Sequence, residues 1–229
     1  MKSLLAALST TVGKKFLMAV TGLLLCGFLI VHLAGNLLLY VDQEGKSYNE
    51  YAHALHSRDV LLKLMEAGLA ALFILHIVLA FKTARENRAA RKVRYYAQQS
   101  KIQDRQSAVK PDTWMFLSGA VILGFLILHL VDFTFLLRTD VPYEDFSNNE
   151  AGKAAAILRT PLTAIVYTIG CIVLGIHLSH GVSSAFQSLG VNHPKYQPLI
   201  RWGGILFAVL IGIGFASFPV VYFFFQPSV

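Results

Sequence analysis

Five long apolar runs, separated by short polar stretches, organise this chain. They cover about residues 15–40, 61–84, 114–138, 161–186 and 199–225. A helix needs about 20 apolar residues to cross a bilayer, and each run reaches that length. The runs are also continuous and far longer than β-strands. We therefore expect an all-α fold, with residues 1–229 forming one domain, an integral membrane bundle of five transmembrane helices.

The first residues show a different pattern. MKSLLAALSTTVG, at 1–13, is followed by Lys14 and Lys15. The apolar run after these lysines is too long for the core of a signal peptide and lacks a clear small-residue cleavage site. We predict that 1–13 forms a short helix lying at the membrane interface.

Composition and charge refine this picture. Of the residues, 55% are hydrophobic and 14% charged, and the mean hydropathy of +0.56 lies outside the range of a typical soluble domain. The net charge of +7 could suit nucleic acid, but the basic residues concentrate at the N-terminus, in 82–110 and between the last two runs, whereas 41–60 and 139–160 are acidic. Basic loops stay in the cytoplasm. We therefore expect a multi-pass protein of the cell inner (plasma) membrane, with a cytoplasmic N-terminus, an external C-terminus and no nucleic-acid partner.

This topology predicts the behaviour of reporter fusions. A reporter fused near Gln98 is expected to behave as cytoplasmic, because basic loops are retained on that side, and one fused near Asn148 as external. Alkaline phosphatase and green fluorescent protein fusions measure the two sides independently. The opposite pattern would invert the inner and outer levels defined below.

With His180 of the fourth run set aside for the moment, four of the eight histidines lie well inside apolar runs, one in each of the first four. They are His32, His76, His129 and His177. A buried ionisable residue in a membrane helix is costly and indicates a function. At 1.5 Å per residue, His76 and His177 lie roughly 9 and 15 Å from the cytoplasmic ends of their helices, and His32 and His129 roughly 13–15 Å from the external ends. The histidines therefore form an inner pair, His76 with His177, and an outer pair, His32 with His129.

The outer pair shares a local sequence. GFLIVHL at 27–33 and GFLILHL at 124–130 are nearly identical, and glycines stand five and ten residues before each histidine. Two imidazoles on facing helices of a bundle are typical axial ligands of heme b, and small residues leave room for the porphyrin. The glycines that could provide this room are Gly22, Gly27, Gly35, Gly119, Gly124, Gly175 and Gly181. Close packing between membrane helices is the other explanation for them.

A zinc or copper transporter is the competing interpretation of the histidines. It would require ligands at one depth, often with carboxylates or thiolates. Cys26 and Cys171 lie inside predicted spans without the spacing of a thiolate site, and we expect them to be apolar packing residues. The two depths favour two hemes b. His53, His56 and His193 fall in connections and are expected to be solvated.

The chain resembles the diheme cytochrome b membrane anchor of succinate dehydrogenase and fumarate reductase, of the single-subunit, five-helix type. The resemblance covers essentially the whole chain. It rests on one histidine in each of the first four spans and on three segments: STTVGKKFLMAVTG near the N-terminus, HLAGN at 32–36 and HLSHGVSSAFQSLG at 177–190. In this family a glycine follows the fourth-span histidine by four residues, which selects His177 over His180 as the ligand. Some members carry a glutamate two residues before that histidine, proposed as a proton path; here Gly175 takes its place.

The resemblance implies partners and an activity. A flavoprotein and an iron–sulfur subunit would bind on the cytoplasmic side, and the complex could form higher oligomers. Electrons would move between succinate or fumarate and a quinone of the membrane lipid, menaquinone or ubiquinone, through two hemes. The chain would be the quinone-reactive subunit of this enzyme and would not bind dicarboxylate or flavin itself, since it has no dinucleotide fingerprint.

Polar residues near the membrane faces supply candidates for propionate and quinone binding. The propionate candidates, which could equally be interfacial anchors, are Ser9, Thr10, Lys14, Lys15, Lys82, Arg85 and Trp114. The quinone candidates near the outer pair are Asn36, Glu66 and Asp132, because quinone turnover requires hydrogen bonds and proton exchange. A second quinone site near Ser9 and Lys15 stays open. So do the alternatives of a heme b subunit of a hydrogenase or formate dehydrogenase, a solute transporter and a purely structural membrane protein.

Overall fold

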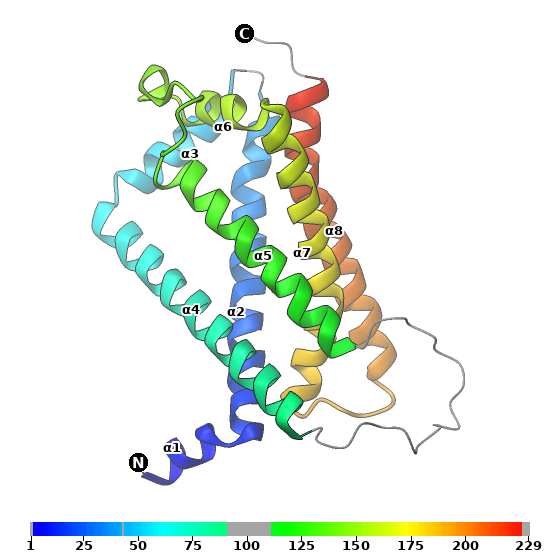
Figure 1. Cartoon of the computed structure of the whole chain (residues 1–229). Helices are drawn as coiled ribbons and strands as arrows, with labels where there is room; N and C mark the ends of the chain where they lie inside the picture. The colour runs from blue at the N-terminus through cyan, green and yellow to red at the C-terminus, as the bar shows by residue number, and fades with distance from the viewer. Residues whose placement is uncertain (1, 43, 91–110, 226–229) are drawn as a thin grey trace.

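The computed structural model describes residues 2–42, 44–90 and 111–225, and the regular secondary structure of these residues is entirely helical (Figure 1). The membrane-length helices are α2 (Thr11–Leu37), α4 (Asp59–Ala90), α5 (Pro111–Phe133), α7 (Pro161–Ser188) and α8 (Gln197–Phe224). All five are long and apolar enough to cross a membrane. The all-α fold with five spanning helices is confirmed, and the chain is a multi-pass membrane protein.

Shorter helices lie at the two ends of the bundle. The N-terminal helix α1 (Lys2–Ser9) is separated from α2 by Thr10, whose hydroxyl accepts the Gly13 N–H at 3.1 Å and so caps α2. At the opposite end, near the end of α8, lie α3 (Lys46–His56) and α6 (Glu150–Leu158) (Figure 1). Two 3₁₀ turns, Leu38–Tyr40 and Tyr143–Phe146, precede them.

The connecting stretches are thus more ordered than the sequence predicted. His53 and His56 were expected in a loop, but they lie in the last turns of α3. The helix is stabilised because the Asp42 carboxylate accepts two of its first backbone N–H groups and because Ala52 is buried. His193 does lie in the connection between α7 and α8.

The third span is shorter than predicted. It was expected to extend to residue 138, but α5 ends at Phe133. The chain then reverses: Leu136 adopts a left-handed φ of 52°, and the Leu137 amide donates to the Val131 carbonyl at 3.1 Å. The reversal brings Arg138 back to within 3.8 Å of Asp132 on α5. An ion pair close to the membrane face thus replaces the last predicted turn.

The helices pack unevenly. Helices α7 and α8 lie side by side (Figure 1), and a Cβ atom added to Gly212 would be 3.2 Å from the Cα of Gly175, so glycines allow this close approach. Helix α2 packs on α4 and α7, and α5 packs on α7, while α4 and α5 scarcely touch. They meet where Phe81 and Phe116 lie 5.4 Å apart. Within an 18-residue apolar stretch of each helix, 39% of α8 is buried inside the protein, but only 6% of α4 and 6% of α5.

The first four spanning helices form two similar units. Each unit is a long helix, a short surface helix and a second long helix: α2–α3–α4, then α5–α6–α7. MAVTGLLLCGFLIVHL at 18–33 matches MFLSGAVILGFLILHL at 115–130. The units meet at the outer end, where the Asn49 amide donates to the Asn149 side-chain oxygen at 3.0 Å and accepts from the Ala151 N–H at 2.9 Å. Each unit contributes one outer histidine from its first helix and one inner histidine from its second.

Candidate functional site

The two outer histidines lie next to each other across the bundle. The ring centroids of His32 on α2 and His129 on α5 are 5.9 Å apart. Metal–imidazole bonds are about 2 Å long, so two histidine nitrogens on opposite sides of one metal atom stand about 4 Å apart. Because each ring centroid lies behind its nitrogen, the observed separation fits two rings that hold one metal atom between them. The structure thus brings together the outer pair inferred from depth.

Aromatic side chains surround the outer pair. Phe28 stacks on His32 with ring centroids 5.2 Å apart, and Phe133 lies 5.0 Å from His129. The rings of Phe125 and Tyr167 each lie 6.0 Å from that of His129. The ring of Phe215 lies 5.4 Å from that of His32. The Nδ1 atom of His129 is buried and has no hydrogen-bond partner within the described part of the chain. Since buried polar atoms are normally hydrogen-bonded, this nitrogen fits a site that a bound group completes.

Each inner histidine is held by a hydroxyl group from the neighbouring helix. The Nδ1 of His76 on α4 lies 2.9 Å from the Oγ1 of Thr21 on α2. The Nδ1 of His177 on α7 lies 3.0 Å from the Oγ of Ser118 on α5. Both hydroxyls donate their single hydrogen to the carbonyl of the methionine three residues earlier, at 3.0 and 3.2 Å. Each hydroxyl oxygen can therefore accept the Nδ1–H of its histidine, an arrangement that leaves the Nε2 lone pair free to bind a metal.

The inner rings also lie against glycines. A Cβ atom added to Gly22 would be 3.4 Å from the Cε1 of His76. The equivalent atom at Gly119 would be 3.6 Å from the Cε1 of His177. Both distances are ordinary contact, so a methyl group would fit, whereas a side chain larger than alanine would crowd the rings. His180, by contrast, is exposed, and its Nδ1 lies 3.2 Å from a carbonyl of its own helix. The contact from α5 therefore distinguishes His177 from His180.

The helices separate the two levels by a fixed distance. His32 follows Thr21, and His129 follows Ser118, by the same 11 residues. Eleven residues are about three helical turns and rise about 16 Å, so each hydroxyl shares a helix face with the outer histidine above it. Thus α2 and α5 each present an inner hydroxyl and an outer histidine to the same side.

Thr21 and Ser118 were not among the residues singled out from the sequence. A hydroxyl in a membrane helix commonly bonds to its own backbone, so neither residue stands out alone. The sequence feature that could have identified them is the repeat. Both residues stand directly before a glycine and 11 residues before an outer histidine.

A buried polar network lies beside the outer pair. Asp132 is only 5% exposed, and its carboxylate accepts the Tyr167 hydroxyl at 2.7 Å and lies 3.8 Å from the Arg138 guanidinium. The Tyr143 hydroxyl donates to the Asp132 carbonyl at 3.1 Å. Arg138 also pairs with the exposed Asp140, and its hydrogen bond lowers the pKa of that carboxyl. Polar groups therefore extend from the outer surface to Tyr167, whose ring lies 6.0 Å from His129.

The other two quinone candidates occupy the same level. Asn36 is half-buried and follows His32 by one turn of α2. Glu66 is exposed and precedes His76 by ten residues, about 15 Å toward the outer end. It lies two turns from Phe73 and on the same face of α4, and Phe73 packs edge-on against Phe28 of α2. Among the described residues, no hydrogen bond joins either side chain to the outer histidines.

Some propionate candidates gather at the end of the bundle where α1 lies. A pocket of about 430 Å³ is lined by Ser9, Lys14, Lys82, Arg85, Glu86 and Ala89. Lys14 forms an ion pair with Glu86, which ties the start of α2 to the end of α4. Lys15 and Trp114, two further candidates, are not part of this lining.

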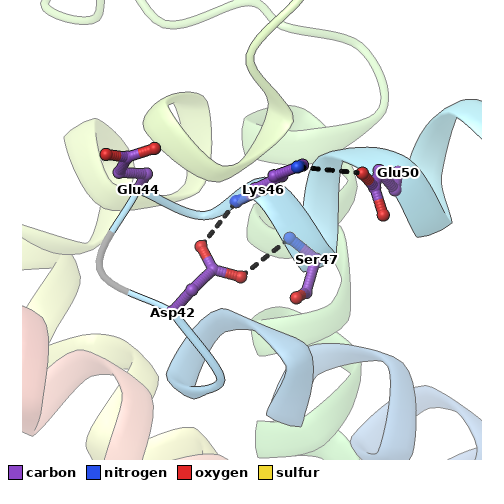
Figure 2. Close-up of a pocket in the computed structure, with 5 residues that line it drawn as sticks. All are labelled: Asp42, Glu44, Lys46, Ser47 and Glu50. Carbon is purple, nitrogen blue, oxygen red and sulfur yellow. Dashed lines mark hydrogen bonds and ion pairs between the residues drawn. The ribbon is translucent and has the colours of Figure 1, made fainter.

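A second pocket, of about 530 Å³, lies at the outer end beside α3 (Figure 2). Two of its three acidic residues, Asp42 and Glu50, are engaged in local structure. The Asp42 carboxylate accepts the backbone N–H groups of Lys46 and Ser47 at 2.6 and 2.9 Å, and hydrogen bonds from Ser47 lower its pKa. Lys46 lies 3.9 Å from Glu50. We assign these contacts to the capping of α3.

The histidines occur in pairs. Within 2–42, 44–90 and 111–225, no group of three or more His, Cys, Asp or Glu side chains could hold a metal ion. Bare zinc sites use three or four protein ligands, whereas heme iron needs only axial ligands from the protein. The paired arrangement, the aromatic lining and the glycine contacts therefore fit heme better than a bare metal ion.

Comparison with protein-family models, with curated proteins and with solved structures found no match for this chain. Its geometry is that of a five-helix membrane protein with four histidines inside its spans, two of them in ring contact.

Proposed function

We propose that the chain is the diheme cytochrome b membrane anchor of a succinate:quinone oxidoreductase. The observation that carries this proposal is the arrangement of four intramembrane histidines at two levels. The outer two have ring centroids 5.9 Å apart, and each inner histidine has its Nδ1 at 2.9 or 3.0 Å from a hydroxyl oxygen of a neighbouring helix. The resemblance of the sequence to that family supplies the identity of the complex. The membrane would be the cell inner membrane, as the charge distribution of the loops predicts.

The protein's contribution is to hold and insulate two one-electron carriers. His76 and His177 would ligate the inner heme b, and His32 and His129 the outer one. Heme, when bound, supplies reversible one-electron iron chemistry. The aromatic and aliphatic residues around the histidines exclude water, and this controls the potential at which the iron is reduced.

The two levels define a direction across the membrane. The inner histidines lie toward the cytoplasmic end, where a soluble iron–sulfur subunit with its flavoprotein would dock. The outer histidines lie about 16 Å further along the helices. Each chain thus provides a path from the site of succinate oxidation to a quinone near the outer face. The same path in reverse would serve fumarate reduction.

The polar residues at the outer level would serve quinone chemistry. Reduction of a quinone to quinol consumes two electrons and two protons. Asp132 and Tyr167 form a buried donor–acceptor pair connected to the surface through Arg138, and Glu66 places a further carboxyl at this level. Carboxyl groups so placed can relay protons and bind the quinone oxygens.

In the complete complex, Asp132→Asn and Glu66→Gln are each expected to slow succinate-driven reduction of a menaquinone analogue by about 10²–10⁴-fold, the usual contribution of a positioned acid or base. Both replacements keep the side-chain shape and remove the titratable group. Reduction of a soluble dye by succinate should stay unchanged, because it bypasses the membrane subunit. Glu44→Gln, at an exposed outer carboxyl, is the matched control. Normal quinone turnover in both variants, with inhibitor binding at the cytoplasmic face, would place the quinone site at the other end.

A further inference from the structure

We propose that Thr21 and Ser118 are positioning residues that select the ligating nitrogen of the two inner histidines and tune the inner heme. The inference rests on the proposed function, since it presumes that His76 and His177 bind heme iron. It assigns a role to two hydroxyl side chains that have no need to be polar for a membrane helix to form.

The hydrogen-bond directions leave one arrangement. Each hydroxyl has a single hydrogen, which goes to the carbonyl three residues earlier in its own helix. Its oxygen can then only accept, so the proton lies on the histidine Nδ1. A 180° rotation of the ring about its Cβ–Cγ bond would place Cδ2 against the hydroxyl in place of Nδ1 and so break this contact. Thr21 and Ser118 thus fix both the tautomer and the direction of Nε2.

The repeat provides independent support. The two hydroxyls are 97 residues apart and occupy equivalent positions in 18–33 and 115–130. Both are strongly buried, with 3% of Thr21 and 5% of Ser118 exposed. Each hydroxyl contacts the second long helix of its own unit, α4 for Thr21 and α7 for Ser118. Each proposed histidine pair, by contrast, joins one unit to the other. The same hydroxyl–histidine contact therefore occurs twice, once on each side of the inner site.

The contact has a chemical consequence for the iron. A hydrogen bond from the distal ring N–H raises the basicity of a metal-bound imidazole and orients it. Stronger electron donation favours ferric iron, so these contacts lower the reduction potential of the inner heme. The outer pair differs, because no hydroxyl among the described residues holds the Nδ1 of His129, so no such contact selects its ligating nitrogen.

The test uses purified holoprotein carrying Thr21→Val or Ser118→Ala. Each variant removes one hydroxyl with little change in volume. Redox titration of the visible spectrum resolves the two hemes, and a His76→Ala preparation identifies the inner component. We expect the inner midpoint to rise, or the inner heme to be retained about 10–100-fold more weakly, the usual cost of losing such a partner. The outer midpoint should stay where it is in the wild type.

Conservative variants and a control separate this role from packing. Thr21→Ser and Ser118→Thr keep the hydroxyl and should retain the wild-type inner midpoint. Thr168→Val removes a hydroxyl whose one partner among the described residues is a carbonyl of its own helix, at 2.7 Å, and it should change neither midpoint. An unchanged inner heme in both Thr21→Val and Ser118→Ala would overturn the proposal, as would an equal shift in the outer heme or in the Thr168 control. A wild-type protein without heme would instead refute the proposed function itself.

Discussion

Replacing either inner histidine by alanine is expected to halve the heme content of the chain. His76 and His177 would ligate one iron from opposite sides, so the loss of either removes an axial bond that alanine cannot restore. The outer heme should persist, because its level is about 16 Å away along the helices. The reverse result is expected for His32→Ala and His129→Ala. A pyridine hemochrome assay counts heme per chain, and two should become one.

The pairing is tested by comparing the four variants. His76→Ala and His177→Ala should leave the same spectral component, and His32→Ala and His129→Ala the other. His180→Ala is the control, because its exposed ring bonds to its own helix, and it should retain both hemes. If loss of His180 removed the inner heme while His177→Ala kept it, the ligand assignment on α7 would be wrong.

The outer histidines should control quinone reduction without affecting the oxidation of succinate. In the complex with its flavoprotein and iron–sulfur partners, His129→Ala is expected to lower succinate-driven reduction of a menaquinone analogue at least about 100-fold, since loss even of an outer-shell partner costs about 10–100-fold. The electron would reach the inner level and have no carrier to the outer one. Stopped-flow spectra should show an inner heme that is reduced by succinate and reoxidised slowly.

Succinate reduction of a soluble dye is the internal control for that experiment. It should match the wild type, because the dye takes electrons before they enter the membrane. Equal loss of both activities would indicate failed assembly, which gel filtration of the complex would reveal directly. Full quinone activity without the outer heme would show that quinone reacts at the inner level.

The sequence predicted the spanning helices well because lipid imposes a simple rule. Every span must be apolar over its whole length, so the runs are visible without any knowledge of packing. The end of α5 was missed because it is decided by tertiary contacts: Arg138 turns back to Asp132 although Leu136 and Leu137 could have continued the helix. The short helices α3 and α6 were missed because sequences of their length carry only a weak hydrophobic periodicity.

Within the site, depth alone was enough to propose the histidine pairs, since helix rise converts sequence spacing into distance. Which side chains touch depends on rotation of each helix, and spacing from a membrane face does not determine this. The bonds of Thr21 and Ser118 to the inner histidines therefore emerged only from the structure. The burial of Asp132 by Tyr167 and Arg138 likewise joins α5 to α7 and has no local sequence signal.

The most direct test of the central claim is the reduced-minus-oxidised visible spectrum of the purified chain, quantified as pyridine hemochrome. The two histidine pairs predict the spectrum of low-spin heme b, with two hemes for each chain and two separable midpoints on redox titration. A purified, folded chain that binds no heme when heme is supplied, or that binds a single heme lost equally in all four histidine variants, would contradict the account.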